Sequence, residues 1–301
     1  MLIIGSHVSF GKDQLLISVK EAISYAADTF MFYTGAPQNT IRKDIDLEKT
    51  TQAQKLMLEN NIDIKKVICH APYIVNPASN DLIKQDFAVS FLQEEIRRCS
   101  LMGITKIVLH PGSAVNETRE EGLNNIIKVL DRVLDNPYDV IILLETMAGK
   151  GNECGINLEE TNYLLRNVKD NRKLGVCLDT CHLNDSGIDI ASFDKYLDDF
   201  DKLIGLERIG CVHVNDSKNP LGSHKDRHEN IGLGTIGFNN ILGVIYNPRL
   251  EEIPFILETP YISKIDNEKE KVYPPYRFEI EMLRLKKFNT HLLEDIREYY
   301  K

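Results

Sequence analysis

The sequence predicts a TIM (β/α)₈ barrel with extra helices at its C-terminal end, and three observations favour this fold. Eight apolar, strand-like segments alternate with segments of helical spacing, which is the pattern of a parallel sheet covered by helices. The chain has 301 residues, enough for a barrel that typically needs about 250. No low-complexity linker divides it, so we expect residues 1–301 to form a single domain.

The expected strands are rich in aliphatic residues, as strands buried on both faces are. They are residues 2–9, 29–33, 66–70, 106–110, 140–145, 174–179, 209–213 and 253–258. Helical apolar spacing lies between them, at residues 14–27, 47–61, 81–102, 120–134, 158–168, 193–203 and 238–245. The charged last segment, residues 268–300, is expected to be a helical outer covering.

Six successive strands, the third to the eighth, end in an imidazole or a carboxylate. These residues are His70, His110, Glu145, Asp179, His213 and Glu258. A barrel directs the C-terminal ends of all its strands into one mouth, where active sites lie. The strand that ends at Asp179 is followed by His182, and Asp179 is expected where the strand emerges into a loop.

The free-energy cost of burying ionised side chains indicates that these residues hold metal ions. A carboxylate at the edge of an apolar core is costly unless a cation or several donors meet it. Imidazole and carboxylate ligands suit zinc, manganese or iron, and six candidates exceed the roughly four ligands of one zinc, so more than one ion is implied. Taken singly, each histidine also fits a structural role, and each acid fits a helix N-cap or an arginine pair.

A polar loop after the seventh strand offers further ligands. Asp226 and His228 stand two apart, so in an extended segment their side chains face the same way and could chelate an ion together with His182. An ordinary polar loop remains the alternative, with His224 as the expected bystander. Cys177 alternates with apolar strand residues, and we therefore expect it to pack in the core rather than bind metal.

Composition places the chain among globular proteins, with 43% hydrophobic and 27% charged residues. No apolar run approaches the roughly 20 residues that span a membrane, and the N-terminal residues lack signal-peptide features, so we expect a cytoplasmic protein without membrane contact. The six cysteines lack CxxC spacing and are expected to be reduced. The net charge of −9 argues against broad attraction to nucleic acid, although bound cations would offset acids in a metal site.

The sequence resembles the endonuclease IV family of apurinic/apyrimidinic (AP) endonucleases. The similarity runs from residue 3 to about residue 262. It rests on the blocks Ile4–Ser9 (IGSHVS), His70–Tyr73 (HAPY), Leu109–Ser113 (LHPGS), Glu145–Gly151 (ETMAGKG), Gly175–His182 (GVCLDTCH), His213–Lys218 (HVNDSK), Gly222–Ser223 (GS), Asp226–His228 (DRH) and Ile256–Thr259 (ILET).

The resemblance implies three Zn²⁺ ions per chain, with Mn²⁺ as an alternative at some sites. By it, the first ion is held by His70, His110 and Glu145, and the second by Glu145, Asp179, His213 and Glu258. The third is held by His182, Asp226 and His228. It further implies hydrolysis of the phosphodiester 5′ to an abasic deoxyribose by a metal-bound hydroxide, leaving a 3′-hydroxyl. Glu145 would position or activate the nucleophile, and Glu258 is the second candidate base.

The expected partner is double-stranded DNA with abasic sites or blocked 3′ ends, bound by a monomer. An abasic nucleotide is easier to extrude than a stacked one, and a side chain can fill the gap. Tyr73 matches the residue that the family inserts into DNA, whereas Gln38 stands where relatives carry an inserting Arg. His7 is expected to be structural or to act behind the ligands. Exposed cations that could contact phosphates are Lys12, Lys150, Lys218, Lys225 and Arg227.

Two other functions remain open from the sequence. A metal-dependent sugar isomerase or epimerase on a similar barrel needs fewer ions, so the additional set of His182, Asp226 and His228 argues against it. A non-catalytic DNA-binding or zinc-storage protein would not need the bridging acid Glu145.

Overall fold

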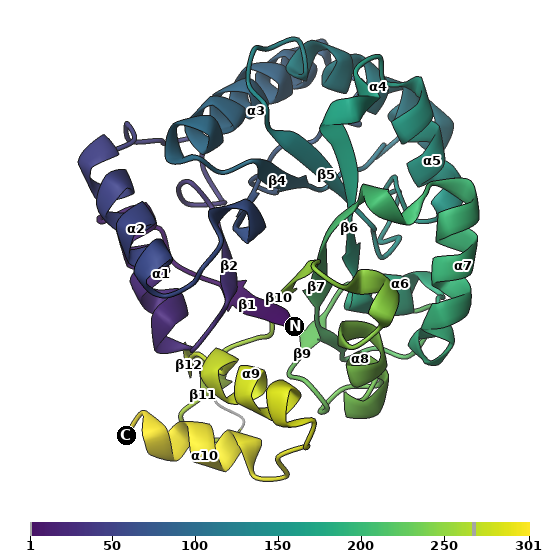
Figure 1. The fold of residues 1–301 in the computed structure, drawn as a ribbon. Coiled ribbons are helices and arrows are strands. Elements are labelled where there is room, and N and C mark those ends of the chain that lie inside the picture. The colour runs from purple at the N-terminus through teal and green to yellow at the C-terminus, as the bar shows by residue number, and fades with distance from the viewer. Residues whose placement is uncertain (1, 267–268) are drawn as a thin grey trace.

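A closed barrel of eight parallel strands forms the centre of the molecule (Figure 1). The structure, a computed structural model, describes residues 2–266 and 269–301. The strands pair in the order β1-β10-β7-β6-β5-β4-β3-β2, so β1 closes on β10 and the expected TIM barrel is confirmed. Their bounds are β1 Ile3–His7, β2 Thr29–Phe32, β3 Ile68–His70, β4 Lys106–Leu109, β5 Ile141–Glu145, β6 Leu174–Asp179, β7 Ile209–Val214 and β10 Pro254–Leu257.

Helices surround the barrel on its outer face (Figure 1). The α-helices of the described residues are α1 Leu15–Ser24, α2 Leu47–Glu59, α3 Leu82–Met102, α4 Arg119–Val133, α5 Leu158–Asn167, α6 Thr180–Ser186, α7 Phe193–Leu203, α8 Phe238–Ile245, α9 Tyr276–Leu285 and α10 Leu292–Tyr299. Of these, α6 is not on the outer face but packs on β6 and β7 at the mouth of the barrel. Side-chain caps mark several of the starts, and Thr118 and Glu121 form a capping box before α4. None of the helices in the described part of the chain is long and apolar enough to cross a membrane.

Two apolar layers hold the barrel. One lies between the strands and the helices, and the other fills the inside of the barrel. The inner layer consists of Met31, Ile68, Val108, Leu143, Cys177, Cys211 and Ile256. Leu143 occupies the space beside Gly175 and Gly210, where a Cβ would lie 2.7 and 2.3 Å from its side chain. The barrel is therefore a packed core.

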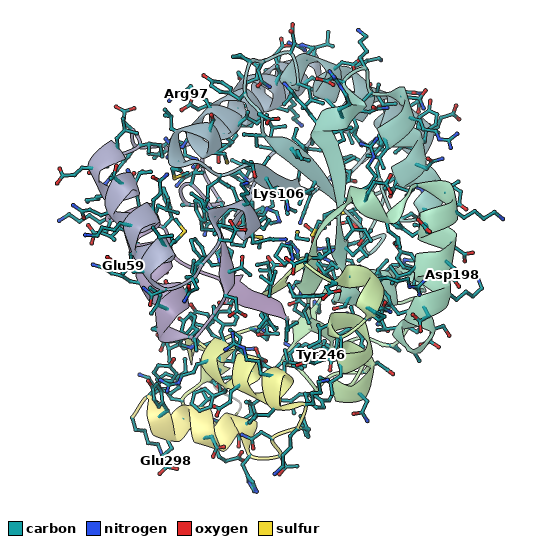
Figure 2. All side chains as sticks on the ribbon, viewed as in Figure 1. Glu59, Arg97, Lys106, Asp198, Tyr246 and Glu298 are labelled. Atoms are coloured by element: carbon teal, nitrogen blue, oxygen red, sulfur yellow. The ribbon has the colours of Figure 1, made fainter. Side chains whose placement is uncertain are left out.

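Lys106, at the start of β4, lies inside the ring of helices, while Glu59 and Asp198 extend into solvent (Figure 2).

The structure corrects the expected C-terminal segment. Residues 268–300 are not one helical stretch: the strand β12 (Lys271–Tyr273) pairs with β11 (Ile262–Ser263), and the two helices α9 and α10 follow. Pro274 and Pro275 explain the break, because proline has no amide hydrogen to continue a helix and is tolerated only at its start. Glu268, the first residue of the expected segment, lies outside the described residues.

A second correction concerns Asp179. It does not open a loop, because α6 begins at the next residue and the Asp179 side chain accepts a hydrogen bond from the His182 amide at 2.7 Å. Asp179 is thus the N-cap of α6. Helix α6 and the short hairpin of β8 (Asp216–Ser217) and β9 (His228–Glu229) are built from polar residues without apolar periodicity, so the sequence pattern did not indicate them.

Candidate metal centre

The barrel brings the six strand-end residues together at the mouth, as the sequence predicted. His70, Glu145 and Asp179 are the last residues of β3, β5 and β6, and His213 lies one residue before the end of β7. His110 and Glu258 follow the ends of β4 and β10 directly. With His182, Asp226 and His228 they form what we call the polar bowl, a group of nine side chains in the mouth.

Glu145 lies between two groups of imidazoles in the polar bowl. Its Oε2 atom is 3.0 Å from His110 Nε2 and 3.3 Å from His70 Nε2. Its Oε1 atom is 3.1 Å from His213 Nδ1 and 3.3 Å from His182 Nδ1. The two carboxylate oxygens therefore face different histidines, which is the arrangement of a bridging ligand.

A second group surrounds His213. Glu258 Oε2 lies 3.0 Å from His213 Nδ1, and Asp179 Oδ2 lies 3.9 Å from the same nitrogen. Asp179 is fully buried, and Glu258 is partly exposed to the mouth with 17% of its side chain accessible. Three carboxylates, including Glu145, thus meet at one imidazole nitrogen.

The third group lies at the rim. Asp226 Oδ1 is 3.1 Å from His182 Nε2 and 3.5 Å from His228 Nε2. Asp226, His228 and His182 therefore lie together, as the sequence predicted. The predicted reason, an extended segment at residues 226–228, is wrong, because Asp226 has φ +55°. The Asp226 amide donates to Asp185 Oδ2 at 2.9 Å, a contact that holds this left-handed turn in place.

The donor set fits divalent cations. Among the residues that the structure describes, all ion-pair partners of the four carboxylates are histidines, and no lysine or arginine neutralises them. The buried His228 Nε2 atom has no hydrogen-bond partner. The Nδ1 atoms of His70 and His182 contact backbone carbonyls at 2.6 and 2.9 Å, so their Nε2 atoms face the carboxylates of Glu145 and Asp226 and are the nitrogens available to a metal ion. Buried acids with no lysine or arginine beside them, together with an imidazole nitrogen that has no hydrogen-bond partner, are surroundings that a bound cation would stabilise.

The charge balance of the polar bowl supports the same conclusion. Burial raises the pKa of Glu145, but His213 and His110 outweigh this effect and hold it well below its usual range. Burial lowers the pKa of His182, while Asp179 and Asp226 raise it well above its usual value. Without metal, protonated histidines must balance the acids. Because metal ligands must be deprotonated, bound cations would replace those protons.

Several residues that position the bowl were not predicted. Asn215 donates to Asp179 Oδ2 at 2.8 Å and accepts from the Glu258 amide at 3.0 Å, so one amide fixes two candidate ligands. Thr146 accepts from the Asp179 amide with its hydroxyl at 3.0 Å, and its carbonyl faces His182. Both residues lie within the sequence blocks that carry the family resemblance, and each follows the last residue of its strand, Glu145 or Val214, but their residue types alone did not indicate this role.

Other predicted bystanders lie outside the three groups. His224 Nδ1 is 3.0 Å from the Ala148 carbonyl. His7 packs on Tyr33, with ring centroids 4.9 Å apart. Cys177 lies in the inner apolar layer as expected, although its sulfur, that of Cys211 and a His213 nitrogen lie close enough to hold an ion. All six cysteines are unpaired.

The predicted DNA-contacting residues are exposed on loops at the same end of the barrel. Tyr73, just after β3, is 54% exposed, and Gln38 is exposed in the loop after β2. Side chains of α3 hold the loop after β2 in place. Glu95 pairs with Arg42 at 2.7 Å, and Arg98 donates to the Thr34 and Lys43 carbonyls at 3.0 and 2.7 Å. The loop is thus held although its tip is free. Lys12, Lys150, Lys218, Lys225 and Arg227 are also exposed.

The barrel and its polar mouth define the class of protein. The sequence model of the xylose isomerase-like TIM barrels matches residues 19–284. Within this class, the chain is 49% identical to the probable endonuclease 4 of Bacillus subtilis, over 98% of this chain and 99% of that one. It is 50% identical to the probable endonuclease 4 of Acholeplasma laidlawii, over 97% and 98% of the two chains. The chain belongs to the endonuclease IV family, which confirms the resemblance and the expected enzyme class.

Solved structures agree with this assignment. Endonuclease IV from Thermus thermophilus superposes with a TM-score of 0.78 at 28% identity. The superposition covers 94% of this chain and 98% of the Thermus chain. A D-tagatose 3-epimerase-like protein gives a TM-score of 0.65 at 19% identity, with 99% and 100% of the two chains covered. The second likeness shows that the barrel is shared.

Proposed function

We propose that this protein is a zinc-dependent AP endonuclease of base-excision repair, which hydrolyses the phosphodiester 5′ to an abasic site in double-stranded DNA and leaves a 3′-hydroxyl. One observation carries the proposal above the others. Four carboxylates and five histidines converge in one mouth, and Glu145 lies between two of their groups. A sugar isomerase on the same barrel would have no use for the third group at the rim.

The three groups are proposed to hold three Zn²⁺ ions, with Mn²⁺ as an alternative at some of them. Nitrogen and oxygen donors suit both ions. The proposed ligands are His70, His110 and Glu145 for the first, Glu145, Asp179, His213 and Glu258 for the second, and His182, Asp226 and His228 for the third.

Bound cations would stabilise negative charge on the phosphate oxygens and make water a stronger acid, as phosphodiester hydrolysis at neutral pH requires. The protein's own side chains would orient the reactants. Glu145 positions the attacking water, and Glu258 is the second candidate to take its proton, because its side chain is accessible from the mouth. Four carboxylates facing three divalent ions leave a net positive mouth, which explains how an acidic protein would attract DNA.

Tyr73 and Gln38 are proposed to contact the DNA at the lesion, and the exposed cations near the mouth to contact its phosphates. Base–aromatic stacking is worth about 1–3 kcal/mol, enough for Tyr73 to fill the gap of an abasic nucleotide. Blocked 3′ ends expose a similar phosphodiester and are proposed as additional substrates. We also propose that residues 1–301 act as a single-domain monomer in the cytoplasm.

Cleavage of an abasic-site duplex by the purified protein tests the proposal. We expect one incision 5′ to the lesion, and a product that a DNA polymerase extends, which reports a 3′-hydroxyl. An undamaged duplex and a ketose sugar serve as the control substrates. A chelator should abolish cleavage and zinc should restore it, with about three ions per chain in the active form. Turnover of the sugar without incision of the duplex would overturn the proposal.

A further inference from the structure

The loop between β4 and α4 carries an unusual residue at its tip. The Glu117 amide donates to the Ala114 carbonyl at 3.0 Å, so residues 114–117 form a tight turn with Val115 as its second residue. Val115 has φ +56°. A positive φ at that position normally selects glycine, asparagine or aspartate, and for a β-branched residue it is a true outlier.

Among the described residues with a positive φ other than glycine, Val115 alone is β-branched. Its side chain is 63% exposed, so burial of the isopropyl group contributes little to offset this strain. Asparagine occupies the next position, so exchanging the order of the two residues would suit the turn better. Strained residues that the surroundings hold in place cluster at sites of function, where the strain serves a purpose.

Neighbouring loops hold the turn from both sides. Asn76, in the loop after β3, donates to the Ser113 carbonyl and accepts from the Ser113 amide, both at 2.9 Å. From the loop after β5, the Asn152 carbonyl accepts from the Ala114 amide at 2.9 Å. Three βα loops thus fix the position of an exposed isopropyl group at the rim of the mouth.

We propose that Val115 is a specificity-determining residue that packs against the bases flanking the abasic site. This inference rests on the proposed function. Apolar side chains fill gaps between unstacked base steps, and Val115 lies on the loop tied by Asn76 to the loop that carries Tyr73. Val115 would form a second apolar contact beside Tyr73, and its rigid branched side chain would lose little rotational freedom on binding.

Val115→Gly and Val115→Asn test this role, because both residues suit the turn and neither presents the isopropyl group. We expect each variant to raise the melting temperature by about 2–4 °C through release of strain. The KM for an abasic-site duplex should rise about 5–10-fold while kcat stays within about twofold. With the DNA saturated by protein, a 2-aminopurine base next to the lesion should show a smaller fluorescence increase, which reports base unstacking in the complex and not the fraction of folded protein.

Glu252→Gly is the matched control. Glu252 also has a positive φ, +67°, and an exposed side chain, but it precedes β10 at the opposite end of the barrel. It should leave KM and the fluorescence change as in the wild type. Unchanged KM and fluorescence in both Val115 variants would overturn the inference while leaving the proposed function intact. Failure of the wild-type protein to incise the duplex would overturn both.

Discussion

Glu279 gives a quantitative test of how the C-terminal helices are joined to the barrel. Its carboxyl group is fully buried on α9, where it accepts from the Ile231 amide at 3.0 Å, the Asn230 side chain at 3.2 Å and the Thr259 hydroxyl. Burial is the main cause that raises the pKa of Glu279 from its usual 4.5 to about 7. The folded protein therefore holds this proton at pH values where the unfolded chain has released it.

The sign follows from proton linkage. Between the unfolded pKa of 4.5 and the folded pKa of about 7, the native state binds more protons, so this group's contribution to stability falls as pH rises. It is fully present below pH 4.5 and lost above pH 7. At about 1.4 kcal/mol per pKa unit, the loss between pH 5 and pH 8 is about 2–3 kcal/mol.

Glu279→Gln should remove this dependence, because glutamine matches the protonated acid in shape and hydrogen bonding. Urea unfolding of wild type and variant at pH 5 and pH 8 measures the difference between their free energies of unfolding. We expect the variant to gain about 2–3 kcal/mol on the wild type over this range. Glu281→Gln, an exposed position on the same helix, is the matched control and should change nothing. Parallel pH profiles of wild type and Glu279→Gln would show that the pKa of Glu279 is not raised in the folded protein.

Three further predictions concern the polar bowl and the DNA. Glu145→Gln should lower abasic-site cleavage more than about 100-fold with an unchanged circular dichroism spectrum, since it removes a bridging charge; near-normal turnover would reject the bridge. Asn215→Ala should lower metal affinity about 10–100-fold in competition with a chromophoric chelator, because two ligands lose their hydrogen-bond partner, and wild-type affinity would contradict this. Tyr73→Ala should weaken binding to abasic DNA about tenfold in a fluorescence anisotropy titration. Tyr299 is equally exposed at 54%, and the control Tyr299→Ala should bind as the wild type does. Equal affinities of the wild type and both variants would exclude the stacking role of Tyr73.

The sequence predicted the barrel and its mouth because one physical pattern serves both. Strands buried on both faces are continuous apolar runs, so the polar residue that ends each run marks where the strand leaves the core. Six such ends, from His70 to Glu258, converge because the helical crossovers make all the strands parallel and closure of the barrel brings their C-terminal ends into one ring. The prediction required no knowledge of which strands are neighbours.

The residues that position the loops around the polar bowl could not be predicted from the apolar pattern of the strands. Asp216 accepts hydrogen bonds from the amides of Gly232, Gly234 and Ile236, and thereby shapes the loop before α8. Asp185 lies on α6 and accepts from the Asp226 amide, 41 residues away. Neither acid stands in a periodic pattern and their partners are distant along the chain, so the spacing of apolar residues does not indicate these hydrogen bonds.

The nine side chains of the polar bowl, Glu145 among them, are proposed to share cations. A crystal structure of the zinc-loaded protein, with anomalous scattering recorded above and below the zinc edge, would locate these ions. We expect three separate anomalous peaks in the polar bowl. One should lie between His70, His110 and Glu145, one beside His213 and Glu258, and one between His182, Asp226 and His228. A map without peaks at these positions, or with zinc bound only elsewhere, would contradict the proposal.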